Sequence, residues 1–333
     1  MNIIYSSSNK YAPYCGISIL SLFENNKDAK TINVYVIDGE ISEENKKKFR
    51  MLERQYGRII TFLDRSKEIE TLKQTAPPYH GHHYTLIRAL PGIMFPDVDK
   101  ILSLGADTII HQSIHSLYSI DLENHLVAWV LHPEFYNGVC IEDPIITSKN
   151  PYYFNADVML FNLNLWRQND YDRKMLQAFN DHKFILAEQS ALAYILEPSD
   201  SKLLPPRYNY WGHIYPDYLR CKMLTSKLFF TKEEIEEAHN SPVIIHYTGY
   251  RTRPWIDGAF ADPKYKEIFK SYKKISPWAN HPNESMEDYY KFKNLPFCKP
   301  LNRAYLKFRY IAPFWIQKQF CLRKKIRFAL RRS

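Results

Sequence analysis

The sequence has none of the features typical of a secreted, disulfide-bonded or membrane-spanning protein. Its five cysteines are scattered and never in CxxC spacing, which argues for reduced thiols and against a disulfide framework or a zinc site. No apolar run approaches the roughly 18–20 residues that a membrane-spanning helix needs. The opening, MNIIYSSSNKY, lacks the basic-then-apolar form of a signal peptide. These absences predict a protein of the cytoplasm.

Acidic residues are missing from the end of the chain. From Lys291 onward there are 13 Lys and Arg and no Asp or Glu, so the rest carries 32 of the 45 basic residues and all 36 acidic ones. The body is therefore mildly acidic, although the whole chain has a net charge of +9. A nucleic-acid-binding enzyme would more often spread basic residues around its cleft. The pattern predicts that the tail binds a separate anionic surface. It does not favour a nucleic acid as a partner.

Short apolar runs alternate with amphipathic stretches in the first half of the chain. Three runs are predicted strands: NIIYS, INVYVID and RIITFLD, at residues 2–6, 32–38 and 58–64. Between them, residues 11–25 and 42–57 are predicted helices, the second with Ser42 as its N-cap. This alternation is typical of an α/β protein with a mostly parallel, doubly wound sheet and helices on both faces.

Ligands of doubly wound sheets gather at the carboxyl ends of the strands. That rule points to Ser6–Ser8, to Gly105–Asp107 and to His246, which follows the apolar run PVII. Each signal is weak alone, because a single Asp after a strand is most often a turn residue and a lone His is usually structural. HGHH at residues 80–83 is interpreted as a loop, since its spacing fits neither a helical face nor a strand face.

Four ordered segments give these positions a context: PDVDKILSLGADTII, YYFNADVMLFNLNLWR, AEQSAL and IIHYTGYRTRPW. From residue 1 to about 260 the chain resembles the family-eight retaining glycosyltransferases, which include glycogenin and bacterial lipopolysaccharide galactosyl- and glucosyltransferases. The resemblance implies a nucleotide-sugar-binding fold of the GT-A type over residues 1–265. A basic, aromatic and helical membrane-associating segment is expected over residues 266–333.

The resemblance also implies roles for single residues. Asp107 and His246 are the expected ligands of Mn²⁺ or Mg²⁺. Gln189, under the anomeric carbon, and Glu188 beside it are the expected catalytic residues. The residues expected to bind the donor are Ser6, Ser8, Tyr11, Arg88, Ala106, Asn155, Gly249, Arg251 and Arg253.

Several positions depart from the family pattern, and the departures cluster at the donor site. Gly105 replaces the first carboxylate of the Asp-x-Asp motif, and Asp157 replaces the glycine after Asn-Ala. Ser8 and Lys10 stand where Asp and Asn are usual, and Leu131 where an acid is often found. Divalent cations favour oxygen-rich, partly anionic ligation, so the loss of one carboxylate is expected to weaken the metal site. Restoring it with Gly105→Asp is then expected to tighten metal binding.

Two hypotheses about function are compatible with these residues. Cleavage of a sugar–diphosphate bond leaves negative charge that a divalent cation or fixed cationic side chains must stabilise. The candidate cations are Lys10, Arg88, Arg251 and Arg253. The first reading is a retaining transferase that moves a hexose from a UDP-linked or similar nucleotide sugar to a saccharide acceptor such as lipopolysaccharide or lipooligosaccharide. The alternative is a weak or inactive pseudo-transferase that binds a sugar nucleotide or a partner transferase. Four residues that match the family pattern favour the enzyme: Gln189, Asn155, Asp107 and His246.

The basic tail indicates contact with a membrane surface. On a helical wheel an apolar face is shared by Trp315, Leu322, Ile326 and Leu330, with most Lys and Arg elsewhere. Such a segment suits shallow insertion into an anionic membrane face, where an oligosaccharide or glycolipid acceptor would be presented. The sequence therefore predicts a peripheral protein on the inner face of the cytoplasmic membrane. The alternative is a helix packed on the acidic body.

Overall fold

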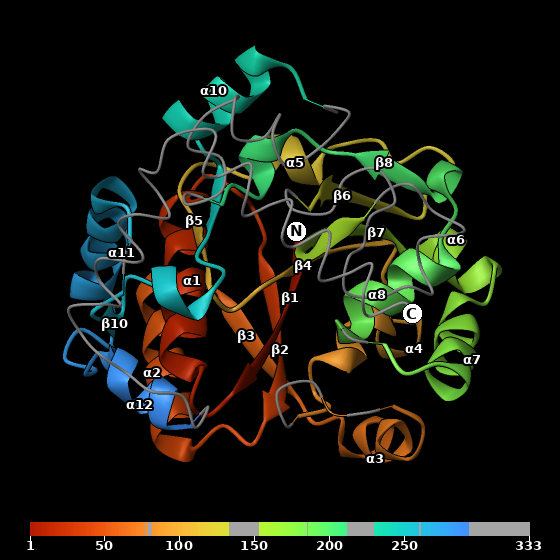
Figure 1. Ribbon diagram of the computed structural model, residues 1–333, viewed down its shortest axis with the longest axis horizontal. Coiled ribbons are helices and arrows are strands. Elements are labelled where there is room, and N and C mark those ends of the chain that lie inside the picture. The colour runs from red at the N-terminus through yellow and green to blue at the C-terminus, as the bar shows by residue number, and fades with distance from the viewer. Residues whose placement is uncertain are drawn as a thin grey trace, which may run out of the picture.

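A seven-stranded sheet forms the centre of the molecule (Figure 1). The computed structural model describes residues 1–76, 78, 82–132, 153–184, 186–211, 230–259 and 261–292. In spatial order the strands are β3 (Ile59–Leu63), β2 (Asn33–Gly39), β1 (Asn2–Ser8), β4 (Lys100–Leu104), β7 (Phe154–Asn162), β6 (Val127–Leu131) and β8 (Ser201–Leu203). Within this sheet β7 runs antiparallel to both of its neighbours, and all the other pairs are parallel. The predicted mostly parallel sheet is confirmed.

The first elements form for reasons that are local in the sequence. β1 is buried from Ile3 to its end, as expected of a strand covered on both faces. Helix α2 (Glu43–Tyr56) begins at Ser42, whose side chain accepts a hydrogen bond from the Asn45 amide. It ends at Gly57, whose φ of 61° is the left-handed conformation that glycine adopts without strain. The predicted strands and helices of this region are confirmed.

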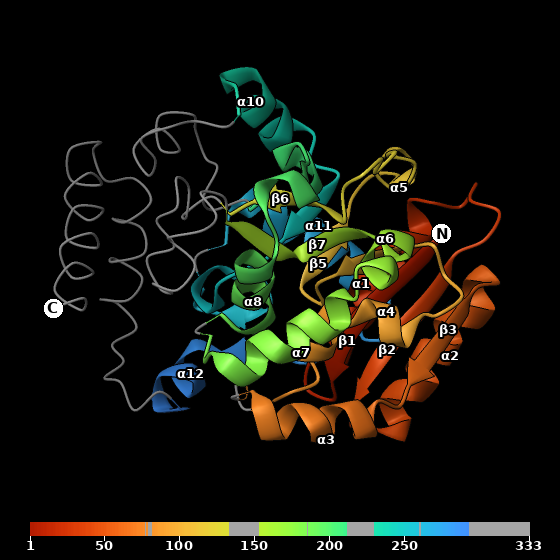
Figure 2. The ribbon, with the colours of Figure 1, turned by 90° about the vertical axis from the view of Figure 1, so that its right-hand side faces the viewer.

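Helices cover both faces of the sheet. One layer consists of α1 (Ala12–Glu24), α2 and α11 (Pro263–Ile275), with α1 in contact with both of the others. The other layer consists of α3 (Ser66–Thr75), α4 (Pro91–Met94), α6 (Leu163–Gln168), α7 (Tyr171–Asp181) and α8 (Ala187–Ile195). Figure 1 shows the first layer on the left and the second on the right, and Figure 2 shows α3, α7 and α8 facing the viewer. The architecture is doubly wound, as predicted.

Short elements complete the fold around this frame. Two small pairs of strands are formed by β5 (Thr108–Ile110) with β9 (Ile244–His246) and by β10 (Ile256–Asp257) with β11 (Glu284–Ser285). The remaining α-helices of the described residues are α5 (His115–Tyr118), α10 (Lys232–Asn240) and α12 (Met286–Phe292). The 3₁₀ turns in the same part of the chain are η1 (Leu86–Ala89), η3 (Pro198–Asp200), η4 (Pro206–Tyr208) and η5 (Tyr250–Thr252).

Helices α11 and α12 pack onto the same hydrophobic core as the N-terminal helices. The expected boundary between residues 265 and 266 falls inside α11, and Phe269, Trp278 and Met286 belong to the core that also contains β1. The apolar face expected at residues 315–330 lies outside the described residues, which end at 292. Among the described helices, none combines the length and apolar character required to cross a bilayer.

Candidate active site

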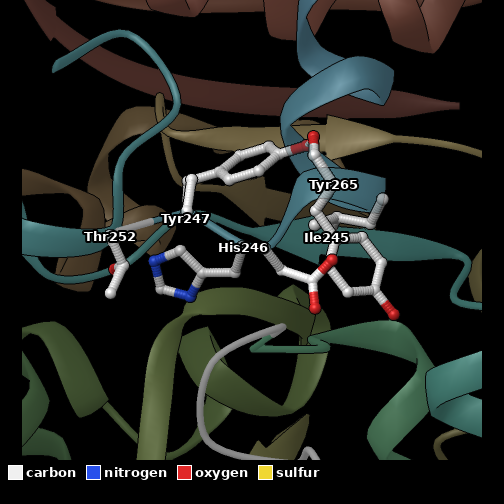
Figure 3. Close-up of a pocket in the computed structure, with 7 residues that line it drawn as sticks. Ile245, His246, Tyr247, Thr252 and Tyr265 are labelled. Atoms are coloured by element: carbon white, nitrogen blue, oxygen red, sulfur yellow. Dashed lines mark hydrogen bonds between the residues drawn. The ribbon is translucent and has the colours of Figure 1, made fainter. Parts of the chain in front are cut away.

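Asp107 and His246 are brought together by the small β5–β9 ladder. β4 ends at Leu104, a short turn follows, and β5 then pairs with β9 so that Thr108 lies opposite His246. The Tyr247 amide donates to the Asp107 carbonyl at 2.9 Å, which extends the ladder by one step. Side chains alternate along a strand. Figure 3 shows the imidazole of His246 pointing away from the phenol of Tyr247, which donates to the Tyr265 carbonyl at 2.7 Å.

A second carboxylate, from Asp157, joins this pair. β7 runs antiparallel beside β4, and the Gly105 amide donates to the Asp157 carbonyl at 2.9 Å. The Nε2 atom of His246 lies 3.4 Å from Asp107 Oδ1 and 3.4 Å from Asp157 Oδ2. Among the described residues, these three form a group whose ligand atoms all lie within 4.8 Å of one another. We call Asp107, Asp157 and His246 the acid–histidine cluster.

Each of the two carboxylates of the cluster accepts a hydrogen bond from an arginine. Arg253 Nη2 donates to Asp107 Oδ2 at 2.8 Å, and Arg88 Nη1 donates to Asp157 Oδ1 at 2.9 Å. Burial alone would raise the pKa of Asp107, but its contacts with His246 and Arg253 hold that pKa well below its usual range. Asp107 is therefore an anion at any pH near neutrality.

Asn209 fixes the orientation of the His246 ring. Its Oδ1 accepts a hydrogen bond from the Trp211 indole at 3.2 Å, so this atom is the amide oxygen. The same oxygen lies 3.0 Å from His246 Nδ1, which must carry the proton that joins them. The other ring nitrogen, Nε2, then faces the two carboxylates. Two carboxylate oxygens and one imidazole nitrogen are donors that Mn²⁺ or Mg²⁺ accepts, so the cluster fits a divalent cation.

An amide pair adjoins the cluster. Gln189 Oε1 accepts hydrogen bonds from the Ala156 amide at 3.0 Å and from Asn155 Nδ2 at 3.1 Å. Asn155 Oδ1 in turn accepts from Asn209 Nδ2 at 2.7 Å. Asn209 therefore links the amide pair to His246. Asn209 is not predicted from the sequence, because RYNYW carries no recognisable spacing signal.

Glu188 is buried against Arg88. The guanidinium donates to Glu188 Oε1 from Nη2 at 2.6 Å and from Nε at 2.9 Å. Only 2% of Glu188 is exposed, and burial raises the pKa of its carboxyl although the charge of Arg88 opposes this. Oε2 of Glu188 has no hydrogen-bond partner among the described residues. Arg88 thus connects Glu188 with Asp157.

The remaining expected donor-binding residues lie near the ends of β1, β4 and β9. Ser6 Oγ donates to the Tyr84 carbonyl at 3.3 Å, and the Tyr11 amide donates to Ser8 Oγ at 3.4 Å. The Tyr11 hydroxyl accepts from Arg253 Nη1 at 2.6 Å. The others are Ala106, which is half-buried beside Asp107, Gly249, whose φ is 82°, and Arg251, whose side chain lies outside the described part of the structure.

The predicted cations are paired with acids. Arg88 binds Glu188 and Asp157, and Arg253 binds Asp107. Lys10 is 69% exposed and lies 3.2 Å from Glu284 on β11. Of the HGHH segment the structure describes His82 and His83, which belong to no helix or multi-residue strand, whereas His80 lies outside the described residues. His83 Nε2 lies 3.0 Å from the Ala76 carbonyl.

The sheet and this site define a glycosyltransferase with the GT-A fold. Residues 2–259 match the model of the family described as "Glycosyl transferase family 8", so the chain belongs to that family. The predicted family, fold and enzyme class are confirmed.

Known proteins of similar sequence and structure agree with this assignment. General stress protein A of Bacillus subtilis is 22% identical over 84% of this chain and 94% of its own. Lipopolysaccharide 1,2-glucosyltransferase of Escherichia coli is 26% identical over 90% of this chain and 86% of its own. The galactosyltransferase LgtC, solved in complex with donor and acceptor sugar analogs, is 21% identical over 83% of this chain and 96% of its own, with a TM-score of 0.66. The last comparison shows the shared fold.

Proposed function

We propose that the chain is a retaining hexosyltransferase that uses a nucleotide sugar, UDP-linked, and a saccharide acceptor of the lipopolysaccharide or lipooligosaccharide type. One observation carries this proposal: the acid–histidine cluster lies against the Asn155–Gln189 amide pair, with Asn209 joining them. The acceptor class is supported by relatives named for lipopolysaccharide glucosyl and galactosyl transfer. The comparisons give no support to the pseudo-transferase alternative.

The acid–histidine cluster is the proposed cation site. Asp107 and His246 would hold Mn²⁺ or Mg²⁺, which when bound neutralises the charge of the departing diphosphate. Arg253 lies on the outer side of Asp107, where its guanidinium can also contact phosphate oxygens. The Tyr11 ring, 5.5 Å from the guanidinium carbon of Arg253, is placed to lie against the base. Gly249 allows the chain after β9 to approach the phosphates, because it has no side chain.

The amide pair and Glu188 are the proposed contacts of the sugar. Gln189 is held by two hydrogen bonds, so its dipole is fixed before the anomeric carbon gains positive charge. Asn155 is held by Asn209 in the same way. The buried Oε2 of Glu188, which has no partner among the described residues, is suited to accept a hydrogen bond from a sugar hydroxyl.

The basic tail is proposed to bring the enzyme to its acceptor. Because α11, Trp278 and α12 pack with the body, we place the start of the membrane-associating segment beyond residue 292 rather than at 266. Its 12 basic residues from 293 to 333 and absence of acids suit an anionic bilayer. The proposed location is cytoplasmic, on the inner face of the membrane.

A screen of donor hydrolysis tests the proposal. Purified protein is incubated with a panel of UDP-, ADP- and GDP-hexoses, with Mn²⁺ or with a chelator, and release of the nucleoside diphosphate is followed. We expect turnover with at least one donor, a UDP-hexose, and a loss of that turnover in chelator. If no donor is consumed while one binds tightly by calorimetry, the chain is a binding protein and the proposal fails.

A further inference from the structure

We propose that Asp157 supplies the carboxylate that residue 105 lacks, so that the cation site of this chain is complete, with one ligand relocated from β4 to the adjacent strand β7. The inference deepens the proposed function and rests on it for the choice of a divalent cation. It reverses the expectation that Gly105 leaves a damaged metal site.

Asp157 fills the space that a side chain at residue 105 would take. A Cβ atom built on Gly105 would lie 2.7 Å from Asp157 Oδ1 and 2.9 Å from both Cβ and Cγ of Asp157. These separations are well inside van der Waals contact. Rotation of the Asp157 side chain can move Oδ1 and Cγ away, but it cannot move Cβ, whose position is set by the β7 backbone. A side chain at residue 105 would therefore force the two strands apart beside Asp157.

The backbone at residue 105 does not itself require glycine. The glycines with positive φ among the described residues are Gly57, Gly249 and Gly258, and Gly105 is not one of them. An ordinary residue could adopt the local conformation of Gly105. Glycine is needed there because the Gly105 amide binds the Asp157 carbonyl at 2.9 Å, which brings the two strands close at the position of Asp157. The two departures from the family pattern thus compensate each other.

The atoms of the acid–histidine cluster that face one another are of the types that bind divalent cations. His246 Nδ1 is used by the hydrogen bond with Asn209, so Nε2 is the ring nitrogen that faces the carboxylates. Asp107 Oδ1 and Asp157 Oδ2 each lie 3.4 Å from that nitrogen. The convergence of these three atoms on one point is the arrangement that a divalent cation requires of its ligands.

The side-chain atoms of these three residues that point away from the centre of the cluster have hydrogen-bond partners of their own. Asp107 Oδ2 accepts from Arg253, Asp157 Oδ1 from Arg88, and His246 Nδ1 faces Asn209. Partners of this kind fix ligand orientation in metal sites. Asp157 is held in the same manner as the two residues predicted from the sequence, which supports an equal role for it.

Manganese binding by the protein alone tests the assignment. Free Mn²⁺ is measured by electron paramagnetic resonance during titration of the wild-type protein, Asp157→Asn and the matched control Asp97→Asn, which changes an exposed acid. The titrations are run without and with uridine diphosphate. We expect Asp157→Asn to weaken Mn²⁺ binding by at least about 10-fold, since changes even to the outer partners of metal ligands cost about 10–100-fold. The control should bind as the wild type does.

A variant that moves the carboxylate from residue 157 to residue 105 keeps the test decisive if a single variant folds poorly. Gly105→Asp alone should lower thermal stability and should not tighten Mn²⁺ binding, because its side chain meets Asp157. Gly105→Asp combined with Asp157→Gly removes that overlap and should restore binding to within a few-fold of the wild type. Wild-type affinity in folded Asp157→Asn, or a folded double variant that binds no Mn²⁺, overturns the assignment. Mn²⁺ binding that depends on Asp157 in a protein that hydrolyses no donor would leave this inference standing and refute the proposed transferase.

Discussion

Single side chains of the proposed active site are held by fixed hydrogen-bond partners. Gln189 and Asn155 are oriented by hydrogen bonds, and Asp107 by Arg253. An active site that is fixed in this way need not reorganise when charge develops on the substrate, which is the main source of electrostatic catalysis. The contribution of each residue should therefore exceed that of an exposed group of the same type.

Gln189→Ala should reduce turnover by roughly 10-fold or more, in the range where one removed electrostatic stabiliser is felt. The reason is the loss of the fixed amide dipole next to the proposed position of the sugar. Turnover of donor hydrolysis is measured at saturating donor. Gln177→Ala is the control, because the Gln177 side chain is exposed on α7 and binds Asp181. Undiminished turnover in Gln189→Ala would remove this residue from the mechanism.

Asn209→Ala should lower the free energy of unfolding by about 1–3 kcal/mol, because buried polar groups of Trp211, His246 and Asn155 then lose a partner. Denaturant unfolding measures the change. Asn283→Ala removes an exposed amide bound to Asp257 and should cost far less. Equal losses in the two variants would contradict the linking role given to Asn209.

At the scale of elements, prediction from sequence succeeded where the cause was local. β1, β2 and β3 follow from apolar runs, and α2 from Ser42 and Gly57, since each signal lies within a few residues of the element. The position of Asp157 could not be predicted, because it depends on how β7 is aligned against β4. A shift of one residue in that alignment would turn Asp157 to the other face.

The N-cap of α2 offers a test at this scale. Ser42→Ala should destabilise the protein by about 1 kcal/mol, since the Asn45 amide loses its acceptor. Thermal or denaturant unfolding gives the value. Ser271→Ala changes an exposed residue inside α11 and should be neutral or slightly stabilising. A similar effect of the two substitutions would mean that the cap contributes nothing.

At the scale of the whole molecule, the distribution of charge supports the proposed membrane-bound acceptor. The body carries all 36 acidic residues of the chain, whereas the segment from 293 onward carries none. An acidic body would be repelled by an anionic bilayer, so a basic tail would orient the enzyme with the tail toward the membrane. The alternative, a tail packed on the body, gives no such orientation.

Truncation after residue 292 should abolish cosedimentation with anionic lipid vesicles and leave donor hydrolysis unchanged, because the described body stays intact. High salt should release the full-length protein, since each basic residue contributes up to about 1 kcal/mol that salt screens. Vesicles of neutral lipid are the control. A truncated protein that binds anionic vesicles as well as the full chain would exclude the tail as the attachment.

The most direct measurement of the central claim is the anomeric configuration of the released sugar. Proton NMR in the first minutes of donor hydrolysis, before the free hexose equilibrates, distinguishes the two anomers. For an α-linked UDP-hexose we expect the α-anomer to appear first, with a rate that falls in Asp157→Asn and in chelator. The β-anomer appearing first would contradict the account of a retaining transferase.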